Sequence, residues 1–222
     1  MSNLGAVPND LVHALSANES ASDLIDIATA DPLSVFQSWY KDAKAAAPET
    51  AGAMTLSTVD AAMKPSARIV MLRSTEGGAF SFATNSQSNK AAHLSQNPFA
   101  SLTFFWAQHN RQVRIDGAVQ EWGATETDAL FTRRRRDAQI GEWTSQGMSA
   151  ATHSSYADAE AERARVAASF DGVTDIPRPP FWRAYKVIPH SIEFWQGNVG
   201  RLHDRVLFTR DNNGWKRERL IA

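Results

Sequence analysis

Three nitrogen-rich side chains alternate near the end of the chain, in the segment EFWQGNVGRLHDR that begins at residue 193. They are Arg201, His203 and Arg205. In an extended segment alternate side chains share a face, with about 7 Å between neighbours, and Leu202 would face the other way, toward a core. A row of cations repels itself unless an anion lies opposite. The spacing therefore predicts an anion-binding site.

A second candidate anion site lies in residues 82–94, which read FATNSQSNKAAHL. Thr84 ends a predicted strand, and a short helix is predicted to open between Ser88 and Lys90. Two hydroxyls, the free N–H groups of a helix start and one ammonium together make a phosphate cradle. Ordinary capping of the helix by Ser88 is the simpler explanation of the same residues.

Arginines are prominent in two further segments. Arg68 and Arg73 flank the apolar centre of a predicted strand, SARIVMLR, and a guanidinium can bind phosphate through two parallel hydrogen bonds. Strand ends that simply reach water would explain each of them equally well. The run from Arg133 to Arg136 ends a predicted helix, where the helix dipole favours cations and solvation explains most such runs.

Composition narrows the class of protein. The net charge is −1 and the pI about 6.6, so the broad basic surface of a nucleic-acid-binding protein is missing. The 222 residues contain no cysteine, which excludes thiolate chemistry and fits a reducing, cytoplasmic location. No apolar run is long enough to span a membrane. The six histidines lack zinc-site spacing, and no P-loop or Gly-x-Ser-x-Gly pattern occurs, so metal-dependent hydrolysis and nucleotide hydrolysis are poor candidates.

The pattern of elements predicts a mainly β domain with peripheral helices. Asp31-Pro32 is typical of an N-cap and first helical residue, and this helix is predicted to end near Ala47. Two more helices are predicted. One follows Thr125, which begins a Thr-x-x-Asp cap with Asp128, and the other spans roughly residues 156–170. Short β-branched or aromatic runs predict strands at 53–60, 66–73, 79–84, 99–107, 111–122, 184–195, 205–210 and 215–222. This number of strands suits a small barrel, preceded by a mobile arm at residues 1–30.

Several motifs, taken together and in order, resemble the pyridoxamine 5'-phosphate oxidase family of FMN-dependent split-barrel proteins. The matching stretches are DPLSVFQSWY, ARIVMLR, FATNSQSNK, NPFASLTFFW, RQVRIDGAV, RRRRDAQIGEW, IEFWQG, RLHDR and GWKRERL. The pair IEFWQG and RLHDR is the most specific. The resemblance implies that residues 31–222 form an FMN-binding split β-barrel, and that two chains form a homodimer with FMN at the subunit interface.

The resemblance also implies a flavin site built from both chains. One chain would hold FMN through Arg68, Arg73, Thr84, Lys90 and Gln112, together with Ser88 of the predicted cradle. The other chain would close over the flavin with Trp195 and Arg205. Gln146 or its neighbour Gly147 would also reach the flavin. Arg201 and His203 would be the catalytic pair that orients the substrate beside the flavin ring.

The chain departs from the family at the predicted substrate pocket. In the family a lysine, a tyrosine, an arginine and a serine hold the phosphate of the substrate, and the matching positions here are Arg73, Leu130, Arg134 and Ala138. Two hydrogen-bonding groups have become apolar, and each loss weakens phosphate binding by roughly 1 kcal/mol or more. Asn89 also stands in the cofactor loop where an arginine is usual.

An apolar pocket and the FAT form of the cofactor strand resemble the phenazine-biosynthesis branch of the family. The first expectation is therefore an oxidase that aromatises a reduced phenazine carboxylic acid, passing electrons through FMN to O2 and releasing H2O2. The second is a pyridoxamine or pyridoxine 5'-phosphate oxidase that makes pyridoxal 5'-phosphate. The third is a split barrel that binds flavin or haem without catalysis. No metal, nucleic acid or membrane is expected as a partner.

Overall fold

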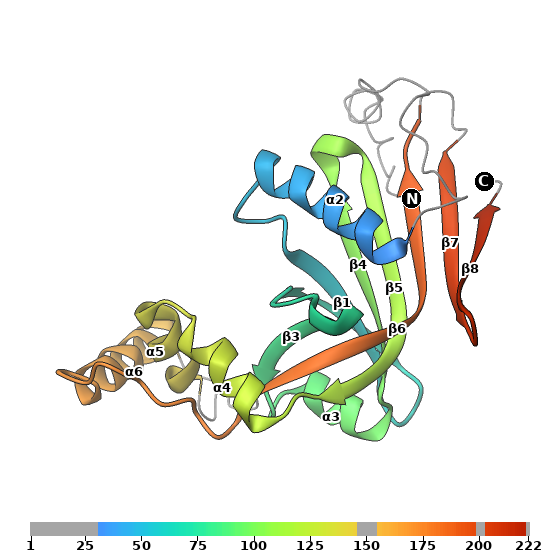
Figure 1. The fold of residues 1–222 in the computed structure, drawn as a ribbon. Coiled ribbons are helices and arrows are strands. Elements are labelled where there is room, and N and C mark those ends of the chain that lie inside the picture. Colours follow the sequence, from blue (N-terminus) through green and yellow to red (C-terminus); the bar gives the residue numbers. More distant parts are fainter. Residues whose placement is uncertain (1–30, 146–154, 199–202, 221–222) are drawn as a thin grey trace, which may run out of the picture. The chain divides into compact units, whose positions relative to one another are not determined.

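The computed structural model describes residues 31–145, 155–198 and 203–220, and the predicted arm at 1–30 lies outside them. Figure 1 labels the elements. The helices are α2 (Pro32–Ala46), α3 (Asn89–Gln96), α4 (Ala124–Thr132), α5 (Arg136–Thr144) and α6 (Tyr156–Ser169). The strands are β1 (Ala53–Val59), β2 (Pro65–Met71), β3 (Phe80–Asn85), β4 (Phe99–Trp106), β5 (Arg111–Glu121), β6 (Trp182–Gln196), β7 (Asp204–Asp211) and β8 (Gly214–Leu220). The described part of the chain is thus mainly β, as predicted.

The strands form one sheet in the order β2-β1-β4-β5-β6-β7-β8, and β3 pairs with β6 off this path. The chain divides into two compact units. The first comprises the described residues up to Leu56, Ser101–Gly117 and the residues from Pro189 onward, and the second comprises Ser57–Ala100 and the residues from Ala118 to Ile188. The strands β1, β4, β5 and β6 contribute residues to both units.

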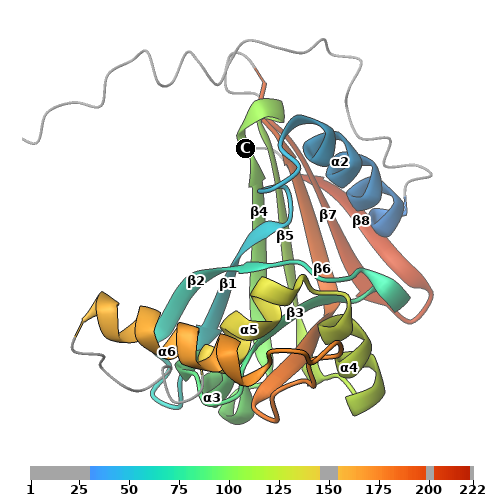
Figure 2. The same cartoon turned by 90° about the vertical axis from the view of Figure 1, so that its left-hand side faces the viewer.

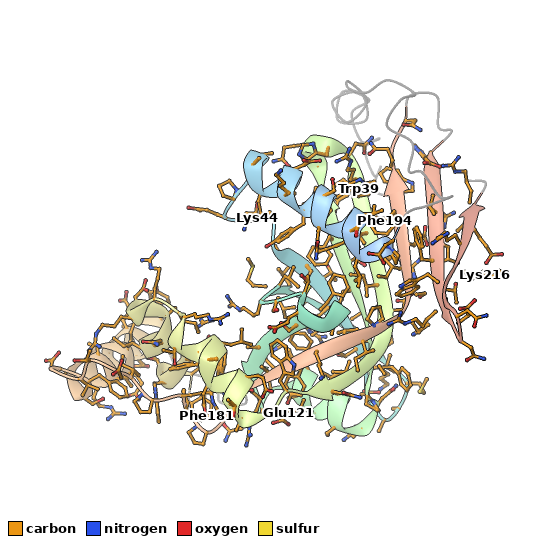
Figure 3. The ribbon with its side chains drawn as sticks, viewed as in Figure 1. Trp39, Lys44, Glu121, Phe181, Phe194 and Lys216 are labelled. Carbon is orange, nitrogen blue, oxygen red and sulfur yellow. The ribbon has the colours of Figure 1, made fainter. Side chains whose placement is uncertain are left out.

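Aromatic side chains form the core of the first unit. Phe36 on α2 packs edge-on against Phe104 on β4, with ring centroids 5.1 Å apart. Trp39, one turn along α2, packs edge-on against Phe194 on β6 at 5.2 Å, and both residues are labelled in Figure 3. Burying such a side chain contributes about 1.5–3 kcal/mol, so α2 is held to the strands mainly by this one face.

In the second unit, α4 packs on the first part of β6. Phe131 of α4 and Trp182 of β6 are both buried, and their rings meet edge-on with centroids 5.3 Å apart. Strand β3 runs antiparallel to the same part of β6, with Thr84 opposite Arg183. This pairing fixes the end of β3, from which the loop into α3 begins. Helices α5 and α6 lie side by side in both views (Figures 1 and 2).

The predicted start of α2 is confirmed, because Asp31 caps the helix by accepting a hydrogen bond from the Ser34 N–H at 2.9 Å. The predicted cap at Thr125 is wrong. Helix α4 follows Gly123, which has no capping side chain, and Thr127 turns its hydroxyl back to the Gly123 carbonyl at 2.7 Å. Among the described helices, none is long and apolar enough to cross a membrane.

Helix α5 was not predicted, because the four arginines conceal the break between two helices. Arg133 is the C-cap of α4, where a cation suits the dipole, whereas Arg136 already belongs to α5. The Arg136 guanidinium donates to the carbonyls of Phe170 and Val173, at 2.7 and 2.6 Å. This arginine therefore ties α5 to the end of α6.

Candidate functional site

The residues of the predicted phosphate cradle lie together at the start of α3. Lys90, in the first turn, donates through Nζ to the Thr84 hydroxyl at 2.9 Å. Ser88 is the N-cap, and its hydroxyl accepts a hydrogen bond from the Ala91 N–H at 3.4 Å. Capping by Ser88 is therefore observed, and the first turn of the same helix is linked through Lys90 to Thr84 near the end of β3.

Arg68 on β2 is held in place by a buried hydroxyl. Its Nη1 donates to Thr58 Oγ1 at 2.8 Å, and Thr58 is 1% exposed. The same oxygen lies 3.0 Å from Nδ1 of His93 on α3. Because Thr58 accepts from Arg68, its own hydrogen is available to His93. The hydroxyl thus links Arg68 on β2 to the helix of the cradle.

The cations of this cluster repel one another. Burial lowers the pKa of the Lys90 ammonium below its ordinary value, and repulsion from Arg68 lowers it further, while Glu142 acts in the opposite direction. Burial also lowers the pKa of Arg68. A doubly charged phosphate would relieve the repulsion and accept hydrogen bonds from the helix start. The residues present therefore fit the phosphate of a flavin mononucleotide.

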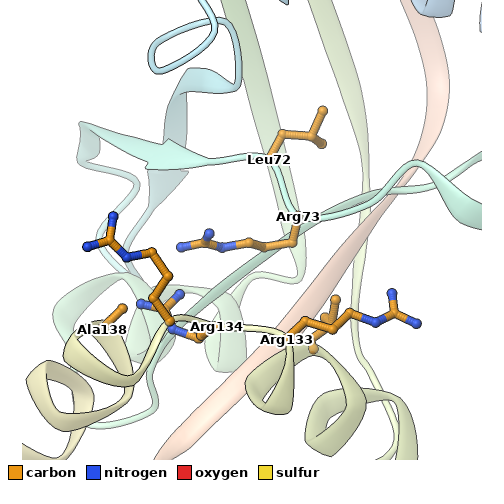
Figure 4. Close-up of a pocket in the computed structure, with 7 residues that line it drawn as sticks. Leu72, Arg73, Arg133, Arg134 and Ala138 are labelled. Carbon is orange, nitrogen blue, oxygen red and sulfur yellow. The ribbon is translucent and has the colours of Figure 1, made fainter.

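A second cationic site in the same unit is a pocket of about 520 Å³. Its lining residues are Leu72, Arg73, Leu130, Arg133, Arg134, Arg135 and Ala138. Figure 4 shows that Arg73 reaches it from just beyond β2 and that Arg133 and Arg134 reach it from the loop between α4 and α5. The four positions predicted to contact the substrate, Arg73, Leu130, Arg134 and Ala138, are thus brought together.

Arg134 is more buried than Arg135, the other arginine of this pocket that pairs with a carboxylate. Its side chain is 14% exposed, and its Nη2 lies 2.6 Å from Oε1 of Glu142 on α5. The guanidinium also lies over the ring of Trp182, 5.6 Å from its centroid. Its Nε is buried without a hydrogen-bond partner in the described residues. Because buried donors are nearly always hydrogen-bonded, the Arg134 Nε–H is available to an acceptor on a ligand.

The pocket has more positive than negative charge. Burial lowers the pKa of Arg73, repulsion from Arg134 lowers it further, and Glu142 opposes both effects. Two carboxylates pair with lining arginines, Glu142 with Arg134 and Asp137 with Arg135. Four lining guanidinium groups and these two carboxylates leave a net charge of +2. The pocket is therefore suited to an anion.

The remaining predicted residues lie in the first unit. Trp195 on β6 and Arg205 on β7 are direct partners across the two strands. The ring of His203 lies on Trp195, with centroids 4.9 Å apart, and its Nδ1 accepts from the Asn198 N–H at 3.2 Å. Arg205 pairs with Glu193 at 2.8 Å. Inside the described chain, Glu193 is therefore the anion beside Arg205.

Two other features of this unit concern Gln112 and Gly197. Gln112 is half-buried on β5, on the face opposite the buried Val113. A Cβ on Gly197 would collide with the side-chain amide of Asn110. The main-chain carbonyl of Asn110 accepts the Gly197 N–H at 2.9 Å. A larger residue at this position would therefore require the Asn110 side chain to move.

Some predictions fall outside the described residues, namely those for Arg201, Gln146 and Gly147. Strand β7 begins at Asp204, so His203 precedes the strand in which Arg205 lies. Sequence reasoning missed Glu142 and Glu193. Glu193 alternates with Trp195 in a motif that was noticed, whereas Glu142 lies on the helix that was not predicted. The described residues contain no group of three or more side chains that could hold a metal ion.

Comparison with known proteins identifies the family. Residues 40–168 match the family model described as pyridoxamine 5'-phosphate oxidase, which covers more than half of the chain. The chain belongs to the pyridoxamine 5'-phosphate oxidase family. Residues 182–222 match the C-terminal dimerisation region of pyridoxine 5'-phosphate oxidase. This match supports a homodimer.

Two pyridoxine/pyridoxamine 5'-phosphate oxidases are similar over most of their length. The one from Maricaulis maris is 40% identical over 97% of this chain and 96% of its own, and the one from Burkholderia mallei is 41% identical over 86% and 88%. PhzG from Burkholderia lata 383, solved in complex with tetrahydrophenazine-1-carboxylic acid, has a TM-score of 0.81 and 26% identity, covering 90% of this chain and 98% of its own. The fold is the split barrel of these proteins, and FMN is the cofactor of this chain.

Proposed function

We propose that this family member is an FMN-dependent oxidase of pyridoxine or pyridoxamine 5'-phosphate, which forms pyridoxal 5'-phosphate and passes electrons to O2 with release of H2O2. The observation that carries the proposal is the net charge of +2 in the arginine pocket. A phosphate monoester carries a charge of about −1.5 to −2 at neutral pH, which this pocket would balance. The relatives at 40–41% identity support the same substrate class.

Arg73 and Arg134 would bind the phosphate of the substrate, with Nε of Arg134 supplying the donor that otherwise lacks an acceptor. FMN supplies the hydride-accepting and oxygen-reacting chemistry when it is bound. The protein then needs only to bind, orient and exclude water, because positioning accounts for a large share of such a barrier reduction. Arg201 and His203 would orient the reacting carbon of the substrate.

The cofactor would be held by the cradle and by the partner chain. Arg68 and Lys90 would neutralise the FMN phosphate, while Thr84 and Ser88 would border it. In this proposal Arg73, Gln112 and Gln146 contact the flavin from the same chain, and Trp195 and Arg205 close over it from the partner chain. We further propose that residues 31–222 act as one flavin-binding domain in the cytoplasm.

The lining of the pocket favours a phosphate ester as substrate over the phenazine carboxylic acid that was expected first from the sequence. Leu130 and Ala138 each lack a hydroxyl, at roughly 1 kcal/mol apiece. Arg133 and Arg135 also line the pocket, and their two guanidinium groups add to those of Arg73 and Arg134. A hydrogen bond to a charged group contributes about 1.5–3 kcal/mol, so two such contacts would offset the loss of both hydroxyls.

The second candidate is oxidation of a reduced phenazine carboxylic acid to its aromatic form. It is favoured by the apolar part of the lining, Leu72, Leu130 and Ala138, which would pack against a tricyclic ring system. The likeness to PhzG, which was solved with a tetrahydrophenazine carboxylic acid, supports this alternative.

An oxygen-uptake assay with the FMN-loaded dimer tests the proposal. The substrates are pyridoxine 5'-phosphate, pyridoxine and freshly reduced phenazine-1-carboxylic acid, each over a range of concentrations. We expect kcat/KM to be about tenfold or more higher for the phosphate ester than for pyridoxine, from one charged contact. Faster uptake with the reduced phenazine would establish the second candidate. If no substrate bleaches the flavin anaerobically, the protein is a flavin carrier and both candidates fail.

A further inference from the structure

Glu193 is a buried carboxylate on the face of β6 that also carries Trp195. Only 8% of the residue is exposed, although it lies among charged neighbours. A buried charge is costly unless it is paired and hydrogen-bonded. The charged groups that pair with Glu193 therefore indicate its role.

Both carboxylate oxygens of Glu193 are engaged by arginines from the two flanking strands. On β7, Arg205 donates to Oε1 through Nε at 2.9 Å and approaches it through Nη2 at 2.8 Å. On β5, Arg114 donates to Oε2 at 3.3 Å and also pairs with Asp116 at 3.4 Å. Two contacts from one guanidinium to one oxygen fix the plane of the Arg205 side chain.

Arg205 keeps one nitrogen for another acceptor. Its Nη1 has no hydrogen-bond partner among the described residues, and its side chain is 30% exposed. Since Nε and Nη2 are held by Glu193, Nη1 lies on the edge of the guanidinium that a ligand can still reach. Arg205 is also the direct cross-strand partner of Trp195, so the free edge belongs to the same surface as the indole.

We propose that Glu193 is the positioning residue for Arg205, orienting its free edge toward the flavin held by the partner chain. This rests on the proposed role of Arg205 in flavin binding. Glu193 itself touches neither flavin nor substrate. Its effect on FMN is expected to pass entirely through Arg205, because a flexible arginine must lose its freedom before it can bind, whereas a paired one has already done so.

The test measures the FMN dissociation constant of the apoprotein by quenching of flavin fluorescence. The variants are Glu193→Gln, Arg205→Gln, the double variant, and Glu193→Asp, which keeps the charge. The matched control is Glu218→Gln, which removes the carboxylate of an exposed ion pair with Lys216 on β8. Thermal unfolding of every variant shows whether it is folded.

We expect Glu193→Gln to weaken FMN binding about tenfold, with partial recovery in Glu193→Asp and no change in Glu218→Gln. In the Arg205→Gln background, loss of the Glu193 charge should weaken FMN no further. Equal effects of Glu193→Gln in both backgrounds would overturn the positioning role, because a purely structural residue acts independently of Arg205. Parental FMN affinity in Arg205→Gln would instead refute the proposed role of Arg205 itself. If Glu193→Gln fails to fold, the comparison of Glu193→Asp with and without Arg205→Gln decides.

Discussion

Replacement of Arg134 by glutamine tests the substrate pocket most directly. The change removes one guanidinium and lowers the net charge of the pocket from +2 to +1. Loss of a charge-assisted contact to the phosphate corresponds to about 1.5–3 kcal/mol, so kcat/KM for pyridoxine 5'-phosphate should fall by about 10- to 150-fold. The measurement is steady-state oxygen uptake at saturating FMN.

Unphosphorylated pyridoxine provides the matched control, because it makes no phosphate contact. Its kcat/KM should stay within about twofold in the variant, because the lost contact is one that only the phosphate ester makes. An equal fall for both substrates would show that Arg134 supports the fold of the pocket and does not contact phosphate. That result would refute the charge argument on which the proposed substrate depends.

Glu142 sharpens the same test, because it pairs with Arg134 at 2.6 Å and is itself mostly buried. The double variant Arg134→Gln/Glu142→Gln restores the net charge of +2 through the remaining three arginines and one carboxylate. We expect it to unfold at a higher temperature than Arg134→Gln and to regain part of the activity with the phosphate ester. No recovery of activity in a stable double variant would show that the geometry of Arg134, and not the total charge, decides binding.

Three further predictions concern the cradle, α5 and the pocket wall. Lys90→Met should weaken FMN about tenfold by fluorescence titration. Because the pKa of Lys90 is lowered by burial and by Arg68, the parental affinity should fall as the pH rises into the alkaline range, and the variant should lose this dependence. Arg136→Ala should lower the free energy of unfolding by about 1–3 kcal/mol in urea and leave FMN affinity unchanged, because it removes two hydrogen bonds to carbonyls beyond the pocket. Ala138→Ser should raise kcat/KM for pyridoxine 5'-phosphate about fivefold and leave pyridoxine unchanged; equal increases would contradict a phosphate contact there.

Much of the fold follows from local patterns in the sequence. The Asp31-Pro32 cap, the alternating strands and the Ser88 cap each depend on residues within a few positions of one another, so the sequence alone places them. The resemblance carried by the family motifs also implies FMN and a homodimer. The break between α4 and α5 was missed because arginine is a good helix former on both sides of it, and no glycine or proline marks the turn.

The pairing of charges was decided only by the tertiary structure. From the sequence alone Arg205 could have lacked an internal partner, yet the structure places it beside Glu193. Arg134 could have been a solvated residue at a helix end, yet the turn into α5 buries it against Glu142. The sequence specifies which charges exist, but the free energy of each depends on burial and on distances between segments that only packing brings together.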